Sequence, residues 1–191
     1  METFDAIHSR HSIAKVKPDA LPRETIQKLL DAGNQAPNHH RARPWRFFVL
    51  TGEARARLGD AMAASLLDRE PAATTEQLDK SRALPLRAPA IIAVSVDAPT
   101  EERIIAIENV CAAAAACQNI LLAAHELGLG AIWRTGVWAR DAKVKEFFGL
   151  APELDLIAFI YVGIPDGEPK INERPPVEDR VMWMEERESR E

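Results

Sequence analysis

The chain has 191 residues, of which 47% are hydrophobic and 28% are charged, and these values exclude an intrinsically disordered protein. Lys and Arg number 24 against 29 Asp and Glu, and the net charge of −5 argues against a protein that binds nucleic acid through its phosphates. Residues 10–45 reverse this balance, with seven Lys or Arg, three Asp or Glu and three His. This local basic patch fits a small anionic ligand better than a polyanion. The length predicts one domain over residues 1–191, alone or paired with a copy of itself.

The first elements expected along the chain are two helices and a strand. A short helix spans 4–9. A second helix begins at Pro22, because proline tolerates the first helical position, and it ends before Pro37. Between these prolines, apolar residues repeat at helical spacing. The apolar run RFFVLT at 46–51 then predicts a strand.

A third helix is expected after this strand, with its apolar face marked by Leu58, Met62 and Leu66. Residues 70–86 are polar, and we expect a helical excursion there. The run AIIAVSV at 90–96 has no polar alternation and predicts a strand buried on both faces.

The second half of the chain is dominated by the longest expected helix, at 100–129, which would extend for about 40 Å. Its middle is small and apolar around most of its circumference, which predicts a central, buried helix. Strands are expected at 131–134 and 154–162, with a helix at 142–148 between them, and an extended tail follows from Gly163. Helices and about four or five strands do not alternate strictly, so the fold class is α+β.

The same alanine-rich stretch bears on membrane insertion and on the redox state of the cysteines. Four polar residues within it would be costly in lipid, so we expect a helix buried in protein rather than a membrane span; they are Glu108, Asn109, Gln118 and Asn119. Cys111 and Cys117 lie six residues apart, on different faces of a helix, which predicts two buried free thiols. The first residues, METFDAIHSRHS, contain no apolar signal-peptide core, and a cytoplasmic location is expected.

Two clusters in the basic segment could hold a ligand. Arg10, His11 and Ser12 follow the first helix and could bind a phosphate, although a solvated basic turn has the same composition. The loop from Gln35 to His39 and His40 is bracketed by prolines, and its amides and imidazoles could bind a planar polar heterocycle. An ordinary helix-terminating loop is the alternative. No acidic or thiol partner stands at ligand spacing, so no metal site is expected.

Two further clusters follow the long helix. Residues 128–136, GLGAIWRTG, place glycines after a helix, so they do not form a dinucleotide-binding fingerprint, which needs them between a strand and a helix. Gly136 could let a backbone N–H approach a ligand ring closely. In the tail, Arg174 could add to a phosphate site or could simply be solvated. Because no nucleophile-and-base pattern is present, difficult chemistry would require a cofactor.

Taken in order, these segments resemble the FMN-dependent nitroreductase family, especially its short single-domain members. The matching motifs cover nearly the whole chain: Arg10-His11-Ser12, Ala36-Pro37, Pro44-Trp45-Arg46-Phe47-Phe48-Val49, Gly128 to Trp133, Gly163-Ile164-Pro165 and Arg174-Pro175-Pro176-Val177-Glu178. The resemblance implies a nitroreductase-like fold. Such a fold has a central mixed or antiparallel sheet flanked by helices, a long buried central helix and an extended C-terminal tail.

The resemblance also implies a homodimer with two FMN sites at the subunit interface. Arg10, His11 and Ser12 would hold the phosphate from one subunit, with Lys170 and Arg174 where longer members place phosphate-binding residues. Gln35 and His39 would contact the flavin from the other subunit. Trp133, Arg134 and Thr135 would close over the cofactor, and a backbone N–H of Thr135 or Gly136 would lie near flavin N5. The family's usual second arginine is His11 here, so FMN retention is expected to weaken as the pH rises.

The activity implied is an NAD(P)H-oxidising, FMN-dependent reductase with a ping-pong mechanism. NADPH or NADH would donate a hydride, and an electron-poor nitroaromatic, quinone or enone would accept electrons, with no catalytic protein acid or base for the hydride step. One alternative is a flavin-binding carrier or sensor without turnover. Another is a different flavin reaction, such as ring dehydrogenation or reductive dehalogenation, which longer insertions over the site usually mark.

Overall fold

The computed structural model describes residues 1–168 and 174–184, and a four-stranded antiparallel sheet lies at its centre. The strands are β1 (Trp45–Thr51), β2 (Ala90–Val96), β3 (Gly130–Arg134) and β4 (Leu156–Gly163). Their order is β1-β2-β4-β3, so β1 and β3 are the edges. Every residue of β2 is buried, as its unbroken apolar run predicts, because helices cover both faces of the sheet.

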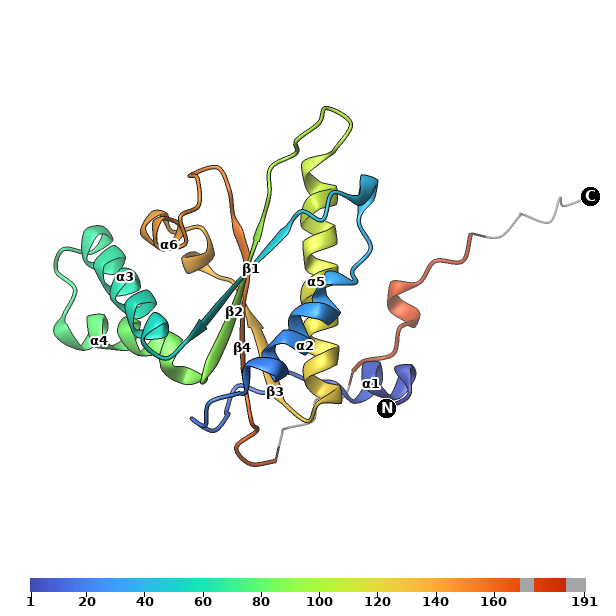
Figure 1. Ribbon diagram of the computed structural model, residues 1–191, viewed down its shortest axis with the longest axis horizontal. Coiled ribbons are helices and arrows are strands. Elements are labelled where there is room, and N and C mark those ends of the chain that lie inside the picture. The colour runs from blue at the N-terminus through green and yellow to red at the C-terminus, as the bar shows by residue number, and fades with distance from the viewer. Residues whose placement is uncertain (169–173, 185–191) are drawn as a thin grey trace, which may run out of the picture.

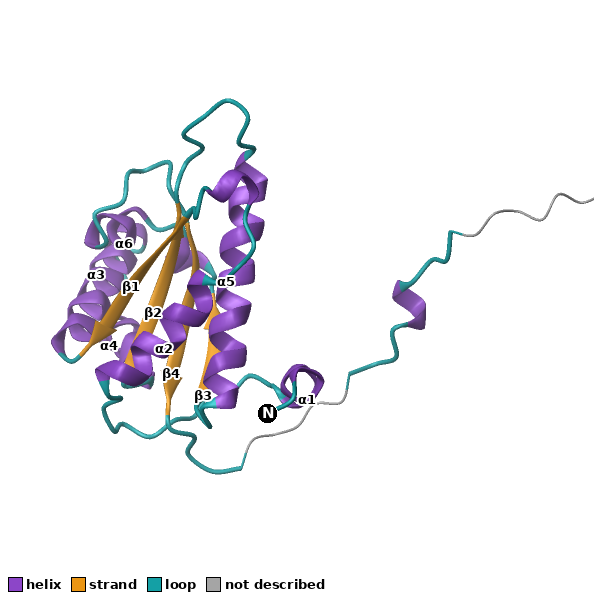
Figure 2. Cartoon of the chain, turned by 45° about the vertical axis from the view of Figure 1, so that its right-hand side comes forward, coloured by secondary structure: helices purple, strands orange, loops and turns teal. Residues whose placement is uncertain are grey.

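Helices form one layer on each face of the sheet (Figures 1 and 2). On one face lie α2 (Arg23–Asn34) and α5 (Ala106–Glu126), and on the other lie α3 (Glu53–Arg69) and α6 (Ala142–Phe147). Helix α4 (Thr75–Ala83) packs on α3, and the short α1 (Thr3–Ser9) lies beside the C-terminal end of α5. This α+β arrangement agrees with the expected fold class.

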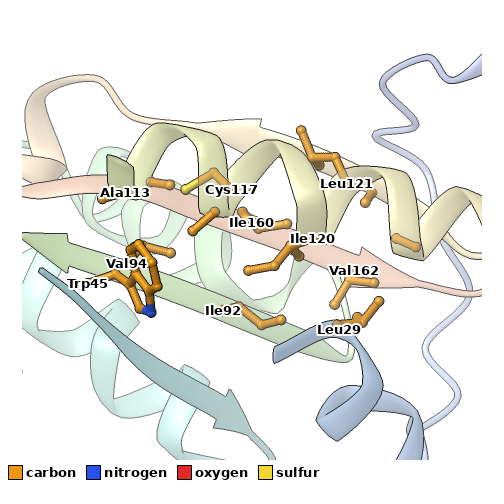
Figure 3. Packing of buried hydrophobic residues seen from close by; sticks show 14 of the residues in the cluster. Leu29, Trp45, Ile92, Val94, Ala113, Cys117, Ile120, Leu121, Ile160 and Val162 are labelled. Atoms are coloured by element: carbon orange, nitrogen blue, oxygen red, sulfur yellow. The ribbon is translucent and has the colours of Figure 1, made fainter. Parts of the chain in front are cut away.

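The larger core cluster lies between α2, α5 and the sheet (Figure 3). Leu29, Ile120 and Ile160 are fully buried in it. Close helix packing depends on Gly33, since a Cβ there would lie 2.9 Å from the Ile120 side chain. By length and composition α5 could cross a membrane, but eight of its 21 residues are buried within the fold, and a core helix can have the same composition.

Two expectations about α5 need correction. The helix begins at Ala106 rather than at residue 100, so its 21 residues extend for about 31 Å rather than 40 Å. Residues before it turn instead, because Ile104 is buried and the Asn109 amide donates to the Asp97 carbonyl oxygen over 3.1 Å. Moreover, only Cys117 of the two free thiols is buried; Cys111 lies on the exposed face of α5.

The expected polar excursion is an ordered helix, α4. Thr74 and Gln77 form a capping box at its N-terminus, which satisfies two otherwise unpaired backbone donors. The tail from 174 to 184 runs away from the body of the protein, as expected for an extended segment (Figure 1). Met182, Trp183 and Met184 are each more than 80% exposed on it.

Candidate functional site

The end of α1 positions two of the expected phosphate-binding residues. Arg10 is the C-cap of α1, and its backbone N–H donates to the Ala6 carbonyl oxygen. The next residue, His11, has its Nδ1 2.8 Å from the Ser9 carbonyl oxygen. Since a carbonyl can only accept, Nδ1 carries the proton. His11 Nε2 is shielded from solvent and has no hydrogen-bond partner in the described part of the chain.

His125, from the C-terminal end of α5, joins this group. Its ring lies 6.4 Å from the ring of His11, and its Nε2 lies 2.6 Å from Ser9 Oγ. Because Ser9 Oγ donates to the Asp5 carbonyl oxygen, it is free to accept from His125. Burial lowers the pKa of His125, and the charges of His11 and Arg10 lower it further, while Glu126 opposes them.

Arg174 of the tail also approaches Arg10. Partial burial lowers the pKa of Arg10, and the charge of Arg174 lowers it further. Within residues 1–168 and 174–184, neither arginine has an ion-pair partner, and the nearby Glu126 pairs with the amino terminus of Met1 at 2.9 Å. We call Arg10, His11, His125 and Arg174 the basic cluster.

The basic cluster has the properties of an anion site: surplus positive charge and partial burial. Ser12 is exposed next to it. The residues present therefore fit a phosphate group. Lys170, also expected to contribute, lies outside the described residues.

The loop that follows α2 lies at the other end of α5. Gln35 is the exposed C-cap of α2, and His39 lines a small hollow with Glu108, Cys111 and neighbouring residues of α5. Asn38 clamps the loop: its side chain donates to the Ala36 carbonyl oxygen and accepts from the Arg43 N–H over 3.0 Å.

The same loop holds three non-glycine residues in the left-handed region, His40, Arg41 and Arg43, with φ of 53°, 56° and 46°. Such conformations are strained and persist where the surrounding structure enforces them, commonly at binding sites. His39 and His40 diverge, with ring centroids 6.5 Å apart and planes inclined by 52°.

One chain does not bring these two regions together. His39 lies beside residues 108–115 of α5, and His11 lies beside His125. His125 lies at least ten positions beyond residues 108–115 on α5, and at 1.5 Å per residue this separates the two regions by about 15 Å or more.

The third expected region follows β3. The Trp133 indole N–H is shared between the Ile157 carbonyl oxygen at 2.9 Å and Thr135 Oγ1 at 3.0 Å, and the Thr135 hydroxyl donates to the same carbonyl. These contacts fix both side chains against the start of β4. Arg134 is exposed, and Gly136 has φ of 68°. The Gly136 N–H has no hydrogen-bond acceptor among the described residues.

His125 is the residue that sequence reasoning missed. It lies 115 residues from Arg10, at the end of an alanine-rich helix, and no motif marks it. The one available signal is compositional, since a histidine in the last turn of an otherwise apolar helix lies near the negative end of the helix dipole.

Comparison with known proteins identifies the family. The nitroreductase family model matches residues 7–164. The chain belongs to the nitroreductase family. It is 33% identical over 181 residues to YfhC of Bacillus subtilis (strain 168), a provisionally named NAD(P)H nitroreductase, covering 94% of this chain and 93% of the relative.

Solved structures agree with this assignment. A nitroreductase-like family protein from Bacillus cereus superposes with a TM-score of 0.84 at 27% identity, covering 97% of both chains. A provisionally named nitroreductase from Desulfovibrio desulfuricans, solved in complex with FMN, has a TM-score of 0.72 at 30% identity and covers 97% of this chain and 98% of that one. The family, the nitroreductase-like α+β fold and the class of oxidoreductase expected from the sequence are thereby confirmed.

Proposed function

We propose that this nitroreductase-family protein is an FMN-dependent reductase that oxidises NADPH or NADH and reduces an electron-poor small molecule by a ping-pong mechanism. A nitroaromatic, a quinone or an enone is the acceptor class. The observation that carries the proposal is the basic cluster, whose two arginines have no ion-pair partner among the described residues and whose positive charge fits a phosphate. The FMN found in the Desulfovibrio desulfuricans neighbour and the NAD(P)H in the relatives' names support the same cofactors here.

Different residues of the chain would bind different parts of the cofactor, according to their positions. Arg10, His11, Ser12 and Arg174 would bind the phosphate, with His125 supporting His11 from α5. FMN, when bound, supplies the hydride-accepting and electron-donating chemistry.

The segment after β3 would set the position of the flavin ring. The Gly136 N–H, which has no acceptor among the described residues, would be available to the ring near N5, with Thr135 beside it. Trp133 would provide a fixed wall, because its N–H is already committed to the protein. Arg134, exposed beside it, would close over the cofactor.

We infer that a complete site needs two copies of the chain. His39 lies beside residues 108–115 of α5, about 15 Å or more along the helix from the basic cluster, and a second copy would supply His39 and Gln35 to the ligand bound there. Exposed apolar residues on α5 and α1 support such an interface: Ile107 is 62% exposed, Val110 38% and Phe4 76%. Burying these side chains against a second copy would be favourable.

A visible absorption spectrum, repeated after anaerobic addition of NADPH, tests the proposal. We expect a flavin spectrum that bleaches with NADPH and recovers on addition of a quinone. A spectrum that bleaches with neither NADPH nor NADH would favour a flavin carrier or sensor. A colourless protein that does not take up added FMN would contradict the central assignment.

A further inference from the structure

A cavity of about 600 Å³ lies away from the regions described above, beside the first turns of α2. Four segments line it: the loop before α2, the N-terminal half of α2, the end of β1 with the start of α3, and Pro89. Gln35 caps the opposite end of this helix, about 18 Å away for twelve residues. We call this the Arg55 cavity; its lining residues are Pro18, Ala20, Leu21, Arg23, Ile26, Gln27, Leu30, Val49, Thr51, Gly52, Arg55 and Pro89.

The charged part of the lining is entirely cationic. Arg23 and Arg55 line the cavity, and among the described residues no Asp or Glu does. In the part of the chain that the structure describes, neither arginine forms an ion pair, although the protein as a whole carries a net charge of −5. Two unpaired guanidinium groups at one cavity favour an anion.

Arg55 is held in place and is left with an unused donor. Its Nη1 donates to the carbonyl oxygen of the buried Ala88 over 2.6 Å. Its Nε is shielded from solvent and has no acceptor among the described residues. A ligand in the cavity would not reach this shielded N–H, but Nη2 is neither shielded nor paired among the described residues and could donate to a carboxylate oxygen. The main chain fixes one side of the guanidinium group, so its position is set before any ligand binds.

The remaining walls are aliphatic. Ile26 belongs to the core, Leu21 and Leu30 pack against it, and Val49 is 41% exposed on the edge strand β1. No aromatic side chain lines the cavity, so nothing there favours stacking with a flat ring. The volume falls within the usual range of small-molecule sites. The lining thus combines a cationic part with an aliphatic surface.

We propose that the Arg55 cavity binds a medium-chain aliphatic carboxylate of about six to eight carbon atoms, with its carboxylate on Arg55 and Arg23 and its chain against Ile26, Leu30 and Val49. The site is separate from the flavin site, and its occupancy does not depend on the proposed reductase activity.

Isothermal titration of the FMN-loaded protein with octanoate tests the site. We expect saturable binding, no comparable binding of octylamine, and a Kd at least about tenfold weaker in Arg55→Gln, because a charge-assisted hydrogen bond is lost. Arg23→Gln, an exposed position that should not affect folding, should also weaken binding. Arg57→Gln is the matched control, since Arg57 is exposed on the same helix and does not line the cavity.

Three results would overturn the proposal. The first is no saturable octanoate binding below about 10 mM. The second is an equal loss of octanoate affinity in the Arg55 and Arg57 variants. The third is displacement of octanoate by NADPH at the flavin. FMN content and NADPH oxidation in Arg23→Gln should match the unaltered protein, which keeps this test separate from that of the reductase.

Discussion

Replacement of Arg10 by glutamine should weaken FMN binding while leaving the fold of the FMN-free protein intact. In the absence of an anion, Arg10 is partly buried, is repelled by Arg174 and has no carboxylate partner in the described residues. Arg10→Gln therefore leaves no protein charge unpaired. The substitution removes only an interaction that forms when a phosphate is bound.

The size of the effect follows from the hydrogen bond that the Arg10 guanidinium group would donate to the phosphate. A hydrogen bond to a charged group contributes about 1.5–3 kcal/mol, which corresponds to about a 10- to 150-fold increase in the Kd for FMN. The unfolding free energy of the FMN-free protein should change by less than about 0.5 kcal/mol, because the group is only partly buried and its strongest charge contact is repulsive.

The assay is the quenching of flavin fluorescence on titration of FMN into the FMN-free protein, with urea unfolding measured in parallel. Arg82→Gln is the control: it removes surface ion pairs with Asp60 and Asp79 on the opposite side of the sheet and should leave the Kd unchanged. An unchanged Kd in Arg10→Gln, or an equal loss in both variants, would refute the assignment of the basic cluster as the phosphate site.

Three further predictions concern pH, packing and thiol reactivity. A bound anion should raise the lowered pKa of His125, so FMN binding takes up protons. As the pH falls from 8 to 5.5, the affinity for FMN should therefore increase more in the unaltered protein than in His125→Gln. Fluorescence titration at each pH measures this difference. Gly59→Ala should lower the unfolding free energy by about 1–3 kcal/mol in urea, because the new Cβ would lie about 2.3 Å from the main-chain carbonyl of Arg82, and an unchanged midpoint would contradict this close approach. Burial raises the pKa of Cys117 to about 12, so Ellman's reagent at pH 8 should modify at most one thiol per native chain, Cys111, and two in denaturant.

The sequence predicted the elements whose signals are local. The strand at 90–96 was predicted with its observed bounds, because an unbroken apolar run needs cover on both faces and only a central strand has it. Helix α2 was predicted to within a residue at its start, because prolines and apolar spacing are read from neighbouring residues. The polar α4 has no apolar pattern of its own in the sequence, since its main contacts are with α3.

The errors have tertiary causes. The long helix was predicted to begin six residues too early, because burial of Ile104 and the Asn109 contact with Asp97 hold that segment in a turn. Cys111 was expected to be buried, because the alanine-rich sequence around it has no polar side that would mark which face lies outward. Neither effect is visible in composition or spacing.

For the candidate site, the sequence by itself determined the residue types, their order along the chain and the family, since these are local motifs and their succession. Only the tertiary structure brought His125 and Arg174 to Arg10, because contacts across more than a hundred residues depend on how α5 runs back toward α1. Only the tertiary structure separated His39 from this cluster, because the length of α5 lies between them. That separation is the physical reason to expect, as the family resemblance also implies, that the site is built from two copies of the chain.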